Sequence, residues 1–130
     1  MMKNISKVMV AICWLMLASS CSHRLAGTWS IQKYEVNTAG QSGFTLSNIG
    51  TITFRNNGKG IKNLNYNILG VAKEDKIPFR WTATDTYVTI DSKGSDLAKT
   101  WLFIENKKKL QVWKATDGAN QVQVLELRKQ

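Results

Sequence analysis

The residues with the clearest chemical potential in this chain are aromatic. Phenylalanine, tyrosine and tryptophan recur on neighbouring predicted strands, so that one face of each strand would point toward a shared interior. Such rings either fill the interior of a small closed sheet or line a pocket that holds one apolar molecule. The sequence leaves both interpretations open. The candidate ligand-lining residues are Phe44, Phe54, Tyr66, Phe79 and Trp81.

Catalytic and metal chemistry are disfavoured by the residue inventory. The single histidine, His23, lies two residues after Cys21, so a Ser-His-Asp triad cannot be assembled within the domain. Carboxylates are the remaining metal ligands, and they fall in or beside predicted turns, where solvated turn residues are far commoner than ligands. These carboxylates are Asp85, Asp91, Asp96, Glu105 and Asp117. We therefore expect no enzymatic activity, no cofactor and no metal site.

The first 20 residues have the pattern of a secretory signal. Lys3 and Lys7 flank the start of an apolar run that ends in small residues before Cys21. The run is shorter than the about 20 residues that a membrane span needs. It resembles a bacterial lipobox, which implies cleavage before Cys21 and acylation of that cysteine with chains such as palmitate. We expect a removed signal at 1–20, a lipidated tether at 21–26 and one domain at 27–130. No cysteine would then remain to form a disulfide.

Beyond the tether, the chain alternates short β-type segments with polar turns and has no helical stretch. The side-chain alternation slips between Ile31 and Tyr34, which predicts a bulge near Lys33. Asn56-Asn57-Gly58 predicts a tight hairpin turn. We expect residues 37–48 to form the longest loop and residues 73–76 a polar turn. The expected strands are 28–36, 49–55, 60–68, 78–83, 87–90, 100–104, 110–114 and 122–127. This pattern predicts an all-β fold, a meandering antiparallel barrel or sandwich of about eight strands.

The Gly27-Thr28-Trp29 start, the strand count and the basic end of the last strand resemble the lipocalin and fatty-acid-binding (calycin) barrels. The chain from Leu25 to Lys129 is most similar to the short lipocalin-like domains of bacterial, Bacteroides-type, lipoproteins. The resemblance implies a small antiparallel up-and-down β-barrel of about eight strands, lipocalin-like, in which the loop after the first strand, with Phe44, covers the barrel mouth. It also implies a barrel-closing signature of Gly27, Trp29 and Arg128, in which Arg128 stacks over the indole as a cation–π pair.

The chain is strongly basic, with a formal net charge of +9 that falls to +7 without Lys3 and Lys7. Its lysines are scattered through turns rather than gathered in one stripe, which disfavours nucleic acid as a partner. Residues 107–109 are three consecutive lysines, which form either a solvated turn or a contact for lipid headgroups or acidic glycans.

These features predict a membrane-anchored, lipocalin-like binding protein of the bacterial cell envelope that holds a small hydrophobic molecule. The alternative is a filled barrel that binds an envelope protein or an anionic glycan and takes no small ligand. Ser22 after the cysteine favours the outer membrane by resemblance to other lipoproteins. The sequence does not tell which face of the membrane the domain would occupy.

Overall fold

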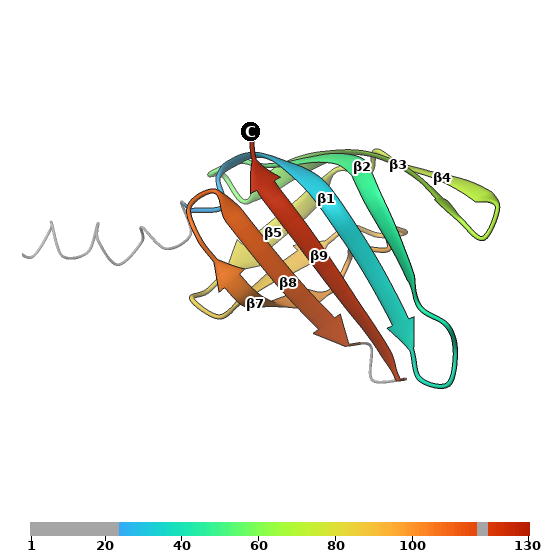
Figure 1. Ribbon diagram of the computed structural model, residues 1–130. Coiled ribbons are helices and arrows are strands. Elements are labelled where there is room, and N and C mark those ends of the chain that lie inside the picture. Colours follow the sequence, from blue (N-terminus) through green and yellow to red (C-terminus); the bar gives the residue numbers. More distant parts are fainter. Residues whose placement is uncertain (1–23, 117–119) are drawn as a thin grey trace, which may run out of the picture.

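The computed structural model describes residues 24–116 and 120–130, and within these ranges the chain is all-β (Figure 1). The strands are β1 (Gly27–Thr38), β2 (Phe44–Phe54), β3 (Lys59–Ile68), β4 (Val71–Asp75), β5 (Phe79–Ala83), β6 (Tyr87–Asp91), β7 (Thr100–Asn106), β8 (Leu110–Thr116) and β9 (Gln121–Lys129). All eight expected strands are present, and β4 is additional. In the part of the chain that the structure describes, no helix is long and apolar enough to cross a membrane.

Eight of these strands close into a barrel. The sheet order is β2-β1-β9-β8-β7-β6-β5-β3, and β2 also pairs with β3, which joins the two ends. Every ladder is antiparallel. The predicted antiparallel barrel is therefore confirmed. Closure satisfies the backbone N–H and C=O groups that an open sheet would leave at its edges.

One side of strand β3 pairs with β2, and its other side divides its length between two partners. Its first residues, Lys59 and Gly60, pair with Arg80 and Phe79 of β5. Its second half, from Leu64 to Ile68, pairs with β4 instead. The β3–β4 hairpin therefore leaves the ring and extends beyond the barrel, as Figure 1 shows for the light-green strands.

Strand β1 contains the predicted bulge. Its register shifts between Ile31 and Lys33 in the ladders with both β2 and β9. The extra residue, Gln32, restores the inward direction of the side chains that follow it. Trp29 and Ile31 before the bulge, and Tyr34 after it, are consequently all buried in one core.

The core fills the barrel with large rings whose polar atoms have partners. Trp29, Trp101 and Trp113 are fully buried. The Trp29 indole N–H donates to the Leu25 carbonyl at 2.8 Å, and the Trp101 indole N–H donates to the Leu97 carbonyl at 3.0 Å. Each tryptophan thus contributes a large apolar area without an unsatisfied donor.

Two loop predictions are wrong. Strand β1 continues to Thr38 and β2 begins at Phe44, so residues 39–43 alone form the loop that was expected at 37–48. Phe44 is thus a strand residue, partly buried against the core, and not part of a lid. The polar turn expected at 73–76 is largely strand β4, which is exposed up to Asp75 and therefore lacks the apolar alternation that marks a half-buried strand.

Candidate functional site

The aromatic residues proposed as ligand-lining occupy different environments. Phe54 is buried and makes edge-to-face contacts with Phe79 and with Trp81, each at a centroid distance of 5.2 Å. Phe44 and Tyr66 are partly buried and pack against the core, and Tyr66 meets the ring of Tyr34 edge-on at 6.0 Å. The structure thus brings Phe54, Phe79 and Trp81 together as packed rings. Their ligand-lining role stays a prediction.

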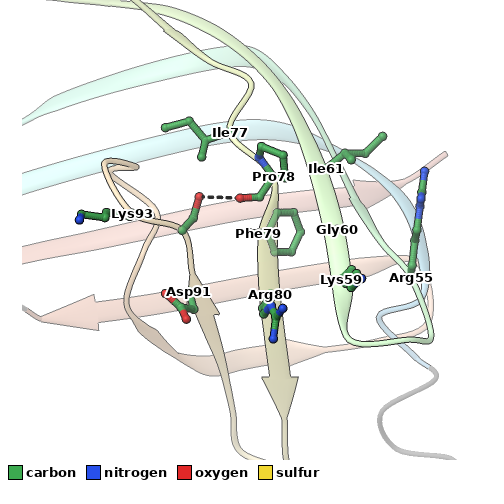
Figure 2. Close-up of a pocket in the computed structure, with 11 residues that line it drawn as sticks. Arg55, Lys59, Gly60, Ile61, Ile77, Pro78, Phe79, Arg80, Asp91 and Lys93 are labelled. Carbon is green, nitrogen blue, oxygen red and sulfur yellow. Dashed lines mark hydrogen bonds between the residues drawn. The ribbon is translucent and has the colours of Figure 1, made fainter.

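A groove of about 510 Å³ lies where β3 and β5 diverge (Figure 2). Its volume is within the range of small-molecule pockets, which is about 300–1,000 Å³. Three apolar side chains, those of Ile61, Ile77 and Pro78, face it together with Phe79, whose ring Figure 2 shows between the two strands. The remaining lining residues are Arg55, Lys59, Gly60, Arg80, Asp91, Ser92 and Lys93.

The groove exists because β3 and β5 share only two paired positions before they separate. At the second pair, the ring of Phe79 covers Gly60. A Cβ atom at Gly60 would lie 2.1 Å from the Phe79 ring, so glycine is the residue that permits this contact. The segment that follows β4 then places Ile77 and Pro78 beside the phenyl ring of Phe79, where they also line the groove.

The rim of the groove is predominantly cationic. Arg55, Lys59, Arg80 and Lys93 line it, and Asp91 is the one carboxylate in the lining. Among the ion pairs of the described residues, none involves these four cations. An apolar floor with a positive rim is complementary to a molecule that has both apolar and anionic parts.

A buried polar network lies behind the groove. The Lys62 ammonium is fully buried and lies 3.0 Å from the Asp75 carboxylate, and it donates to Ser92 Oγ at 2.9 Å. Ser95 Oγ and the Ile77 backbone N–H donate to the same carboxylate, at 2.6 and 3.2 Å. The network fixes the chain on both sides of the groove, because Ile77 and Ser92 line it.

The Lys62–Ser92 contact has the composition of a serine–lysine dyad, but its surroundings favour a structural role. Burial lowers the pKa of the Lys62 amine, whereas the hydrogen bond and charge of Asp75 oppose that change. The net effect is a lowered pKa, but in the structure Lys62 Nζ donates both to Asp75 Oδ2 at 3.1 Å and to Ser92 Oγ, so its hydrogen bonds place it as a donor toward the serine. Ser92 Oγ also donates to the Pro78 carbonyl at 3.3 Å. The serine hydroxyl and the amine are thus both engaged in contacts that hold the fold together, which favours the structural role.

A second, smaller hollow of about 220 Å³ separates the β3–β4 hairpin from the segment between β6 and β7. Asp96 accepts hydrogen bonds from Tyr66 Oη at 2.7 Å and from Lys73 Nζ at 3.2 Å. Burial raises the pKa of the Tyr66 phenol, and the hydrogen bond to Asp96 adds to this rise. These contacts hold the hairpin against residues 92–99.

The end of the barrel that contains Trp29 is closed by a lysine. Lys129 Nζ lies 5.1 Å from the Trp29 ring centroid and donates to the Ala26 carbonyl. Gly27 makes room for it, because a Cβ there would lie 2.8 Å from Lys129 Cε and because its φ of +121° suits glycine. The prediction that Arg128 stacks on Trp29 is wrong, since Arg128 alternates to the exposed side and lies 3.7 Å from Glu126.

Cys21, the signal at 1–20 and Asp117 lie outside the described residues. Within residues 24–116 and 120–130, no group of three or more histidine, cysteine or carboxylate residues could hold a metal ion.

The comparisons with known proteins support the fold. Comparison with protein-family models and with curated protein sequences found no match. Among solved structures, the chain is similar to a lipocalin-like protein from Bacteroides uniformis, with a TM-score of 0.51. The two are 13% identical, and the match covers 82% of this chain and 99% of that chain. The predicted lipocalin-like domain is thus confirmed at the level of fold.

Proposed function

We propose that this protein is a lipid-anchored binding protein of the bacterial cell envelope that holds a small hydrophobic molecule in the groove between β3 and β5. One observation carries the proposal: the groove combines a volume of about 510 Å³ with an apolar floor. Ile61 and Ile77, which line it, are 47% and 37% exposed, so they present apolar surface that a ligand would cover. Lipocalin-like folds are typically binding folds, and we assign the protein no catalytic role.

The anchor in this proposal is Cys21, acylated after removal of residues 1–20, and the site of action is the outer membrane. The apolar signal-like run before Cys21 supports it. Metabolic labelling with an alkyne-modified palmitate tests it directly. The full chain should incorporate label, and Cys21→Ser should abolish incorporation. Equal labelling of both chains would refute the anchor while leaving the groove untouched.

Ligand binding is tested with N-phenyl-1-naphthylamine, a neutral dye that fluoresces in apolar sites. The full chain is held in zwitterionic lipid nanodiscs, and empty nanodiscs supply the background. Saturable binding should fall at least fivefold in Ile61→Asn. The matched control is Ile104→Asn, because Ile104 is 58% exposed on β7 and does not line the groove. Equal binding by the two variants would refute the groove as the site.

The second candidate function is an interaction module that takes no small ligand. The edge-to-face packing of Phe54 with Phe79 and Trp81 favours it, since these rings fill space that a barrel ligand would need. The basic surface would then contact an anionic glycan or an envelope protein. Saturable binding of a defined sulfated oligosaccharide, with no binding of the neutral dye, would select this function over the first.

A further inference from the structure

Two cations lie side by side at the end of the groove where β3 and β5 are still paired. Lys59 and Arg80 are direct cross-strand partners in the β3–β5 ladder, and both side chains are exposed. Side chains at such positions have Cβ atoms about 4.5–5.5 Å apart, and like charges there are destabilising. An anionic group between them would offset that repulsion and could accept hydrogen bonds from both.

The neighbouring charges strengthen this preference. Arg55 and Lys93 also line the groove, and Asp91 is the single acidic residue in the lining. Asp91 is the cross-strand partner of Arg80 on the β6 side, so its negative charge partly offsets the positive charge of Arg80. The groove lining retains a net charge of about +3. The buried cation behind it, Lys62, is already balanced by Asp75 and adds no net charge.

The apolar and cationic residues occupy adjoining parts of one site. Figure 2 shows Lys59 and Arg80 along the strands below Phe79, with Ile77 and Pro78 on its other side. A head group at the cation pair would therefore leave its attached chain next to Ile77 and Pro78. Arginine suits such a head group, because its planar guanidinium binds two oxygens of a carboxylate or phosphate at once.

We propose that the groove selects free, single-chain amphiphiles with an anionic head group, bound by Lys59 and Arg80, and that the apolar floor holds the chain. This inference rests on the proposed function and specifies the ligand class. The site lies on the outer side of the β3–β5 junction and not inside the barrel.

The test is competition against the neutral dye in zwitterionic nanodiscs that contain the full chain. Four competitors share a straight alkyl chain of ten carbons and differ in the head group: undecanoate, decyl phosphate, decanol and decyltrimethylammonium; decanoate, one carbon shorter than undecanoate, serves as the carboxylate in the comparisons below. The two anions should displace the dye at concentrations at least tenfold lower than decanol requires, and the cation should be the weakest competitor. Raising the ionic strength should narrow these differences, since exposed charges are screened by salt.

The variant Lys59→Gln/Arg80→Gln should reduce the preference for decanoate over decanol at least fivefold and leave decanol unchanged. The control Lys33→Gln/Lys114→Gln removes the same net charge from exposed positions on β1 and β8 that do not line the groove. The preference of this control for decanoate over decanol should equal that of the natural chain. Tryptophan fluorescence and circular dichroism verify that both variants keep the barrel.

The outcomes separate the two proposals. Equal displacement by decanoate and decanol, or equal effects of the two double variants, would overturn the anionic selectivity while the dye-binding groove stands. Failure of the dye to bind at all would overturn the groove itself. Nanodiscs of anionic lipid distinguish the source of the ligand. If decanoate binds the natural chain equally well in both lipids, the free amphiphile is supported; if anionic lipid blocks the site, it is overturned in favour of membrane lipid.

Discussion

Breaking the buried ion pair behind the groove is expected to have the largest effect of any single charge change in the described domain. Asp75→Asn removes the charge that balances Lys62, whose side chain is fully buried, while Asp75 itself is 7% exposed. The ammonium then keeps the hydroxyl of Ser92 and the ring of Phe79, whose centroid lies 5.9 Å away, and neither carries a negative charge. The substitution therefore leaves a charge in the interior without its counter-charge.

The magnitude follows from the geometry. Two unit charges 3.0 Å apart attract by about 5.5 kcal/mol at an effective dielectric constant of about 20. Removal of one partner from a buried pair typically costs about 3–5 kcal/mol, a large share of the about 5–15 kcal/mol that stabilises a domain. For a domain of this size, we expect the thermal midpoint to fall by at least about 10 °C.

Thermal unfolding of the full chain in a mild nonionic detergent, followed by tryptophan fluorescence, measures this fall. The matched variant is Lys62→Met/Asp75→Asn, which removes both charges but keeps an oxygen acceptor for Ser95 and for the Ile77 N–H. It should recover at least half of the lost midpoint. The reasoning is refuted if Asp75→Asn unfolds within about 2 °C of the natural chain, or if the double variant loses as much as both single variants together.

Three further changes test other contacts. Gly60→Ala would put a methyl group within van der Waals overlap of the facing ring, and overpacking of this kind should cost about 1–3 kcal/mol, measured by urea unfolding. Lys129→Met removes the cation over Trp29 and should cost about 1–2 kcal/mol in the same assay, whereas Arg128→Met should change stability by less than about 0.5 kcal/mol. Burial alone would raise the pKa of Asp96, but hydrogen bonds from Tyr66 and Lys73 and the lysine charges lower it below its usual 3.8. The carboxylate therefore stabilises the fold above about pH 4, and this contribution is lost as the pH falls through the lowered pKa. The midpoint difference between the natural chain and Asp96→Asn should accordingly shrink between pH 5 and pH 2, and a constant difference would contradict the assignment.

The features that could be predicted from the sequence are those that depend on the local alternation of apolar and polar residues along a strand. The change of parity between Ile31 and Tyr34 identifies the bulge in β1, because a buried strand face cannot otherwise change sides. The turn residues between apolar runs locate the other strands. The same alternation also applies to two lysines. Lys62 has the parity of Leu64 and is buried, and Lys129 has the parity of Leu127 and reaches the ring of Trp29, so alternation alone indicates the inward side for both.

The groove could not be predicted, because it depends on pairing between strands that are not consecutive. Lys59 and Arg80 are 21 positions apart, and they meet because the start of β3 pairs with β5 before the strand passes to β4. A local pattern gives no sign of this exchange of partners. Strand β4 is exposed almost throughout and carries no apolar alternation, so it resembles a turn until its pairing with β3 is known.

The adjacency of β1 and β9 affects how the domain is made. These strands share one of the two longest ladders of the barrel, from Trp29↔Lys129 to Thr38↔Gln121, yet they are the first and the last strands of the chain. Synthesis therefore delivers the partner of the first strand only after all the others. Until then Trp29 and Ile31 lack the Leu127 side of their core and stay accessible to chaperones. The described barrel can therefore close only after β9 has been synthesised, and this closure depends on contacts of high sequence separation, which form slowly.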